Sequence, residues 1–131
     1  CIRDSTHCAA NQVLYNVGSR GIEYDLLPLM RQHQIPVMAY CPLAQAGRLR
    51  RGLLNHPALR QIAGEHHATV PQILLAFLLA QPGVLPIPRT GSAQHAQQNA
   101  AAAEIRLSAE ELALLDAAFP KPKRKTRLEI V

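Results

Sequence analysis

The segment VMAYCPLAQAGRLR, from Val37 to Arg50, decides how the chain is organised. It begins as a short apolar run, which is typical of a strand covered on both faces, and it turns sharply at Tyr-Cys-Pro. Two other apolar runs, NQVLY and VLPI, resemble its first part. We predict strands over 11–15, 36–40 and 84–87.

Helices are predicted between and after these strands. Apolar residues at helical spacing indicate helices over 22–33 and 70–81. A proline at the first helical position predicts another over 57–66. Pro28 conflicts with a long regular helix, so we expect it in a first turn or at a bend.

Capping signals mark where three of the helices begin. Thr69 with Gln72 and Ser108 with Glu111 have the spacing of capping boxes, and a further helix should follow Ser92 and run to about residue 102. Leu112, Leu115 and Phe119 should face inward from the last helix. The tail from Pro120 looks extended and solvated.

The alternation of strands and helices predicts an α/β fold with parallel strands and right-handed crossovers. Three parallel strands alone would leave both edges of the sheet unpaired and much apolar surface poorly covered. The pattern therefore looks like part of a larger β/α sheet or barrel.

Composition limits the classes of function. The chain has 131 residues, 48% of them hydrophobic, and a formal net charge of +5. Five of its basic residues lie in the tail between Lys121 and Arg127, so a basic face for nucleic acid is not supported. No apolar run approaches the ~18 residues that a membrane span needs. Because the chain begins Cys-Ile-Arg-Asp, we expect it to be processed or a fragment.

Cysteine and histidine residues give no sign of a metal site. Three cysteines, an odd and sparse count, fit a reducing, cytoplasmic environment. His7 beside Cys8 and the pair His66–His67 lack the spacing of zinc ligands, so we predict surface histidines and no metal.

Three stretches together resemble the aldo-keto reductase family. They are NQVLYN, then GIEYDLLPLMRQHQIPVMAYCPLAQAGRLR, then LPIPRTGSAQHAQQNAAAAEIRLSAEELALLDAAF, in the order and spacing of that family. The resemblance implies the C-terminal part of a TIM-type (β/α)8 barrel, with about strands six to eight and their helices, incomplete in this chain. The resemblance covers the chain from about Asn11 to its end. It implies that residues 1–131 are one partial domain, in which 120–131 form an extended basic tail.

The resemblance also implies a function. The chain is similar to bacterial members that reduce small aldehydes such as methylglyoxal, and the implied cofactor is NADPH, with NADH possible. The intact enzyme would bind a small carbonyl substrate in the cytoplasm, with no nucleic acid or membrane partner.

The turn after residues 36–40 is implied to hold the nicotinamide and the pyrophosphate. Tyr40 would stack on the nicotinamide ring and leave its other face open for hydride transfer; alternatively it closes the core at the strand end. The loop under the pyrophosphate would consist of Cys41, Pro42, Leu43, Gln45, Gly47 and Arg48, with Arg48 otherwise a solvated loop arginine. Cysteine is a poor hydrogen-bond donor where most relatives have serine.

Further residues are implied around the rest of the cofactor. Gln12 would bind the carboxamide, or else be a polar residue at a strand end. Arg89 would contact the 2′-phosphate beside Thr90 and the N-terminus of a helix, while His95 replaces a second arginine and weakens a strict NADP preference. Gln98 and Asn99 would lie at the adenine. The alternative is an ordinary capped helix.

Catalytic residues are not predicted in this chain. The family reaction uses a tyrosine acid tuned by a lysine and an aspartate, and a histidine that orients the substrate. All three lysines follow residue 120, so none in the body can lower a tyrosine pKa. We expect the chain alone to be inactive. The alternative function is a truncated half-barrel that acts only by association with a missing N-terminal half, or with a copy of itself.

Overall fold

A computed structural model describes residues 8–45 and 48–128 of the chain. Its centre is a sheet of three parallel strands in the order β1-β2-β3, where β1 spans Asn11–Leu14, β2 spans Val37–Tyr40 and β3 spans Val84–Pro86. Each observed strand begins and ends within one residue of the predicted limits. The parallel pairing confirms the α/β prediction.

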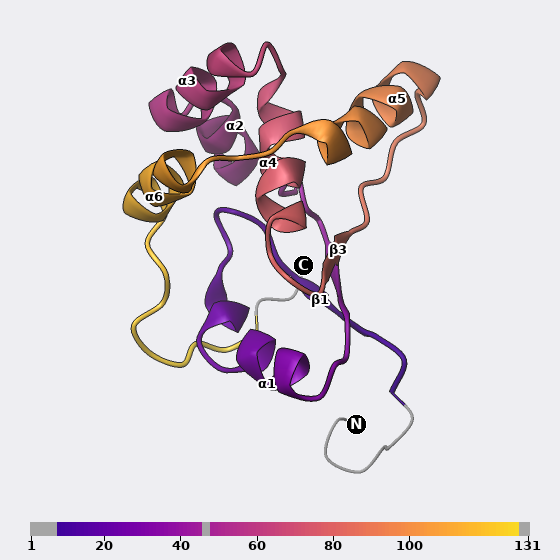
Figure 1. The fold of residues 1–131 in the computed structure, drawn as a ribbon, viewed down its shortest axis with the longest axis vertical. Helices are drawn as coiled ribbons and strands as arrows, with labels where there is room; N and C mark the ends of the chain where they lie inside the picture. Colours follow the sequence, from indigo (N-terminus) through magenta and orange to yellow (C-terminus); the bar gives the residue numbers. More distant parts are fainter. Residues whose placement is uncertain (1–7, 46–47, 129–131) are drawn as a thin grey trace.

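The described residues also form six α-helices and two short 3-10 helices (Figure 1). The α-helices are α1 (Leu26–Gln32), α2 (Arg48–Leu54), α3 (Pro57–Glu65), α4 (Val70–Leu79), α5 (Ala93–Ala101) and α6 (Ala109–Ala118). The 3-10 helices are η1 (Gly21–Glu23) and η2 (Ala102–Glu104). Among the described helices, none is long and apolar enough to cross a membrane.

Local sequence signals explain most of the helix limits. Pro57 occupies the first turn of α3, as predicted. Both predicted capping boxes form: the Thr69 N–H donates to the Gln72 side chain over 2.9 Å, and the Ser108 N–H donates to Glu111 over 2.7 Å.

Two helix predictions were wrong in part. The predicted helix over 22–33 is divided, because η1 ends at Glu23 and α1 begins only at Leu26. Pro28 then lies in the first turn of α1, where a missing N–H costs little. The second error is α2, which begins at Arg48, a residue that we had placed in a loop.

The core lies on one side of the sheet. Val13, Val37 and Ala39 are buried there, and they belong to one cluster with Met30 of α1 and with α4. Residues Ile73 to Leu78 of α4 are all buried, since α4 contacts β3 of the sheet as well as α2, α3 and α5. Leu115 of α6 is fully buried, and Leu112 and Phe119 pack against the same cluster, as predicted.

The C-terminal tail, from Pro120 to Leu128, contains neither helix nor strand. Most of its residues are exposed, but two lysines form ion pairs: Lys121 with Asp116 (3.1 Å) and Lys125 with Asp25 (2.9 Å). Thr126 lies so close to Gly21 that a Cβ atom there would be 2.6 Å from its hydroxyl. The tail therefore contacts the body of the protein along part of its length.

Candidate functional site

The carboxyl ends of the three strands meet at one edge of the sheet, because the strands are parallel. β2 ends in Tyr40 and leads into the turn of Cys41 to Ala44, while β3 leads into Arg89 and Thr90 before α5. In a parallel β/α sheet, this edge is where ligands bind. The sequence-predicted residues of both segments thus lie at the edge suited to a binding site.

One face of the sheet is open among the described residues, and it carries two predicted residues. The register pairs Gln12 with Met38, Leu14 with Tyr40, and Met38 with Leu85, so their side chains share a face. Gln12 is exposed, Tyr40 is half-buried, and Leu85 is 53% exposed although it is a large apolar residue. This face is therefore accessible at Gln12 and Leu85, whereas Leu14 on the same face is buried; the opposite face, with Val37 and Ala39, is covered by helices.

The turn after β2 has an unusual backbone. Cys41 has a φ of 49° and Ala44 a φ of 57°, both in the left-handed region that residues with a Cβ rarely adopt. The carbonyl of Cys41 accepts a hydrogen bond from the Ala44 N–H over 3.0 Å. Pro42 is buried and Leu43 packs against the core cluster. The turn is therefore held in a costly conformation by its surroundings.

The rest of the predicted pyrophosphate loop is less enclosed. Gln45 is exposed, and Gly47 lies outside the described residues. Arg48, predicted in the loop, is instead the first residue of α2 and is exposed. Arg50 and Arg51 are also exposed. An arginine at the start of a helix lies near free backbone N–H groups, which also attract anions.

The segment after β3 forms a capped helix start. The Thr90 hydroxyl accepts from the Ser92 N–H over 3.1 Å, and the Ser92 hydroxyl accepts from the His95 N–H over 3.4 Å. Arg89 and His95 are exposed. This arrangement leaves the first N–H groups of α5 and the Arg89 side chain open to an anion.

The remaining predicted residues lie on α5, where 95, 98 and 99 share one side by helical spacing. Gln98 and Asn99 are half-buried, and the Gln98 carbonyl accepts from the Gln72 side chain of α4 over 3.0 Å. A groove of about 340 Å³ lies between α4, the end of β3 and α5. Thr90 and Asn99 both line it, so these two predicted residues are brought together.

The predicted residues thus form two groups. Gln12, Tyr40 and the following turn form one group on the open face and its edge, and Arg89 to Asn99 form the other around the start of α5. The turn of the first group follows β2 and the second group follows β3, and these two strands are neighbours in the sheet. Between the groups, the described residues form no hydrogen bond or ion pair.

Asn16 is a site residue that sequence reasoning missed. It is 1% exposed, and its side-chain amide donates to the Cys41 carbonyl over 3.1 Å. Its side-chain oxygen accepts from the Gly18 N–H over 3.0 Å. The signal was an amide residue directly after Tyr15, the end of the predicted strand, but no local pattern indicated its partner, since Cys41 is 25 residues away.

Arg20 is the second missed residue, and it fixes the segment after β1. Its guanidinium is bidentate to Glu23 (2.7 and 2.8 Å) and also donates to Asp116 (2.8 Å) and to the Phe119 carbonyl (2.7 Å). Burial lowers the pKa of Arg20, but hydrogen bonds to Glu23 and Asp116 outweigh this and raise the pKa. The charge is thus paired on several sides although the residue is only 5% exposed.

Tyr15 joins the same buried cluster. Its hydroxyl donates to Glu23 over 2.7 Å, and its ring meets Phe77 edge-on at 6.3 Å between centroids. Burial, together with the hydrogen bond to Glu23, raises the pKa of Tyr15 far above its ordinary value. Tyr15 is therefore a neutral core residue.

The structure corrects one prediction about the histidine residues. His66, predicted at the surface, is only half-exposed, and its Nε2 lies 2.7 Å from the Glu111 carboxylate at the start of α6. His7 lies outside the described residues. Within the ranges 8–45 and 48–128, no three His, Cys, Asp or Glu side chains come together in a group that could hold a metal.

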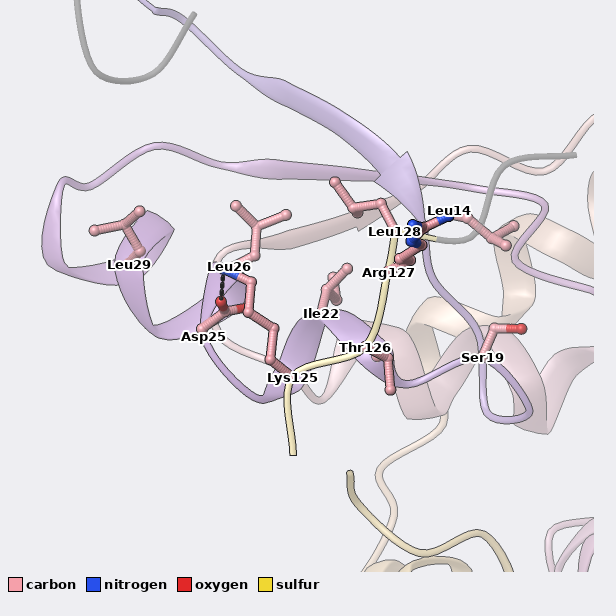
Figure 2. A pocket seen from close by; sticks show the side chains of 11 residues that line it. Leu14, Ser19, Ile22, Asp25, Leu26, Leu29, Lys125, Thr126, Arg127 and Leu128 are labelled. Atoms are coloured by element: carbon pink, nitrogen blue, oxygen red, sulfur yellow. Dashed lines mark ion pairs between the residues drawn. The ribbon is translucent and has the colours of Figure 1, made fainter. Parts of the chain in front are cut away.

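A larger cavity than the groove beside α5 lies against the tail (Figure 2). It measures about 560 Å³ and lies between Leu14 at the end of β1, Leu26 and Leu29 of α1, and the tail residues Lys125 to Leu128. The Asp25–Lys125 ion pair lies at its rim. None of the described residues predicted to bind the cofactor lines it.

Comparisons with known proteins agree on one family. The model of the "Aldo/keto reductase family" matches residues 3–119. Methylglyoxal reductase YeaE of Escherichia coli is 56% identical over 124 residues, which cover 95% of this chain and 44% of the relative. Pyridoxine 4-dehydrogenase of E. coli is 38% identical over 110 residues, covering 83% of this chain and 36% of that protein.

Solved structures give the same result. An aldo-keto reductase from Klebsiella pneumoniae, crystallised in complex with NADPH, matches with a TM-score of 0.91 and 60% identity over 95% of this chain and 44% of its own. The chain thus spans less than half the length of these relatives, and the three strands and six α-helices of its described residues are a part of the reductase barrel. On its sequence and on its fold, the chain belongs to the aldo/keto reductase family.

Proposed function

We propose that the chain supplies the cofactor-holding part of an NADPH-dependent reductase of small aldehydes and ketones. In this proposal β1, β2 and β3 are strands six, seven and eight of the barrel. The observation that carries it is the position of the predicted residues: those at the ends of β2 and β3 share one edge of the sheet, and Gln12 shares an open face with Tyr40. The Klebsiella relative crystallised with NADPH supports the choice of cofactor.

Each end of the cofactor would meet a different group of residues. The Tyr40 ring on the open face would lie under the nicotinamide, and Gln12 would bind the carboxamide. The turn from Cys41 to Leu43 and the start of α2 would hold the pyrophosphate through backbone N–H groups and Arg48.

The adenosine end would bind at α5. Arg89 is exposed beside a capped helix start, which suits the 2′-phosphate, while Gln98 and Asn99 would face the adenine. Bound NADPH would supply the hydride. The proton would come from residues of the barrel that lie outside this chain, so we place no catalytic residue here.

The test is NADPH binding by the purified chain, followed by the quenching of tyrosine fluorescence or by calorimetry. We expect saturable binding that is weakened more by Arg89→Ala than by Arg60→Ala, an exposed arginine of α3. NADH should bind more weakly than NADPH, because it lacks the 2′-phosphate. Absence of binding, or equal effects of the two substitutions, would contradict the proposal.

The substrate needs a separate experiment. We expect the chain alone not to oxidise NADPH in the presence of methylglyoxal, and we expect activity once the remaining β/α units of a relative are supplied, covalently or in trans. Turnover by the chain alone would show that a proton donor is present among these 131 residues.

A second candidate is a part-barrel that acts only when it associates with another chain. The observation that favours it is the sheet itself: among the described residues the outer edges of β1 and β3 pair with no further strand, and Leu85 is exposed on the open face. Sedimentation of the isolated chain tests it, since a concentration-dependent dimer would support this candidate and a monomer at all concentrations would oppose it.

A further inference from the structure

We propose that Asn16 is a positioning residue that holds the turn after β2 in the shape that the cofactor needs. This inference rests on the function proposed above, and it adds a residue that does not touch the cofactor in that proposal. The residues involved are Asn16, after β1, and the turn from Cys41 to Ala44.

Asn16 is well placed to hold this turn, because all of its polar side-chain atoms are engaged or enclosed. It is 1% exposed, and its amide nitrogen donates to the Cys41 carbonyl over 3.1 Å while its oxygen accepts from the Gly18 N–H over 3.0 Å. Its backbone also pairs with Ser19 through two hydrogen bonds of 3.4 and 3.0 Å. Asn16 is thus fixed before it reaches across to the neighbouring strand end.

The Cys41 carbonyl is the point on which the turn depends. It accepts from Asn16 and also from the Ala44 N–H over 3.0 Å, so both of its lone pairs have partners. Cys41 has a φ of 49° and precedes Pro42, whose ring restricts the backbone before it. A non-glycine residue persists in such a conformation only when the contacts around it hold it there.

The chemistry requires an amide rather than another polar group. A carboxylate in place of the amide would present an oxygen to the Cys41 carbonyl, and the two acceptors would repel each other. Loss of the donor should therefore free the Cys41 peptide to rotate. Because Tyr40 directly precedes Cys41 in the chain, its ring and the N–H groups of the turn would move together.

The experiment compares three variants in the full 131-residue chain. Asn16→Asp keeps the acceptor for Gly18 and removes the donor to Cys41, and Asn16→His keeps a ring N–H that can donate in its place. The matched control is Asn55→Asp, because the Asn55 amide also donates to a backbone carbonyl, that of Arg51 over 2.9 Å, but on the exposed surface.

Two readouts separate positioning from simple destabilisation. The first is hydrogen exchange at the Ala44 N–H, which bonds to the Cys41 carbonyl, and we expect Asn16→Asp to speed it about fivefold or more. The second is the Kd for NADPH, which we expect to rise about tenfold, as when one well-formed polar contact is lost. Asn16→His should restore both values in large part, and Asn55→Asp should change neither.

The outcomes are distinct. Unchanged exchange at Ala44, or exchange that rises equally throughout the core, would overturn the inference. Faster exchange at Ala44 with an unchanged Kd would also overturn it, because the turn would then not matter to the cofactor. If the unmodified chain binds no NADPH, the proposed function fails, and the exchange at Ala44 alone decides whether Asn16 holds the turn.

Discussion

Tyr15 and Tyr40 stand side by side at the ends of neighbouring strands, and their surroundings differ completely. The Tyr15 N–H lies 3.5 Å from the Tyr40 carbonyl, yet Tyr15 is fully buried on the helix-covered side, while Tyr40 is half-buried on the open face. The segment after Tyr15 carries the buried Arg20 cluster, and the segment after Tyr40 carries two strained residues. The first segment stabilises the fold, and the second is available for binding.

Replacing Arg20 should have the largest effect on stability. Arg20→Ala leaves the largely buried Glu23 carboxylate without its cation, while Asp116 keeps its ion pair with Lys121, and the loss of a buried partner costs about 3–5 kcal/mol. Chemical denaturation measures it, with Arg60→Ala as the exposed control. A cost below about 1 kcal/mol would show that the segment after β1 is not the stabilising one.

Replacing Tyr15 tests the same buried cluster through the pH dependence of the free energy of unfolding. Tyr15→Phe removes the hydrogen bond to Glu23, which should cost about 1.5–3 kcal/mol at neutral pH. Because the pKa of Tyr15 is raised in the folded protein, its contribution is fully present below about pH 10 and is lost as the pH rises further.

The measurement is the free energy of unfolding between pH 8 and pH 12. The unmodified chain should lose stability above about pH 10 more steeply than Tyr15→Phe. Tyr24→Phe is the matched control, because Tyr24 is 49% exposed. Identical alkaline slopes for the unmodified chain and Tyr15→Phe would remove Tyr15 from the stabilising cluster.

Replacing Cys41 tests the strain in the turn after β2. The expected change in stability is smaller than that of Tyr15→Phe and has the opposite sign. Cys41→Gly should stabilise the fold by up to about 1 kcal/mol, since glycine adopts a φ of 49° without steric cost, less the entropy that it adds to the unfolded chain. Ala39→Gly, at a buried strand position, should destabilise instead. Thermal denaturation compares the two, and a destabilised Cys41→Gly would argue against strain in the turn.

Tyr40 should have the smallest effect on stability. Because its side chain lies on the open face, Tyr40→Ala should change the free energy of unfolding by less than about 1 kcal/mol. The same substitution should weaken NADPH binding, if the proposed stacking exists. A large loss of stability would instead support the alternative, in which Tyr40 closes the core.

Short-range signals made most of the fold predictable. The strands are apolar runs that end at turns, and Thr69–Gln72 and Ser108–Glu111 cap helices through contacts three residues apart. α2 was missed because it follows a strained turn and the sequence before it offered no capping signal that we could use. The division of the helix over 22–33 depends on η1, which is fixed by Arg20 and its distant partners.

Long-range polar contacts could not be predicted from one sequence. Arg20 meets the Phe119 carbonyl 99 residues later, and Asn16 meets Cys41 across two strands. In each pair, the two residues become neighbours only when the parallel sheet has formed. The candidate cofactor residues were found through the family resemblance. The structure shows that the ends of β2 and β3 share one edge of the sheet, and among the described residues it shows no hydrogen bond or ion pair between the two groups.

The most direct test of the proposed NADPH site is an NMR titration of the chain with NADPH, in which the backbone amides are observed residue by residue. We expect the chemical-shift changes to concentrate at Gln12, at the turn from Tyr40 to Ala44, and between Arg89 and Asn99. Shifts that concentrate around the cavity beside the tail, from Lys125 to Leu128, or no shifts at all, would contradict the proposed site.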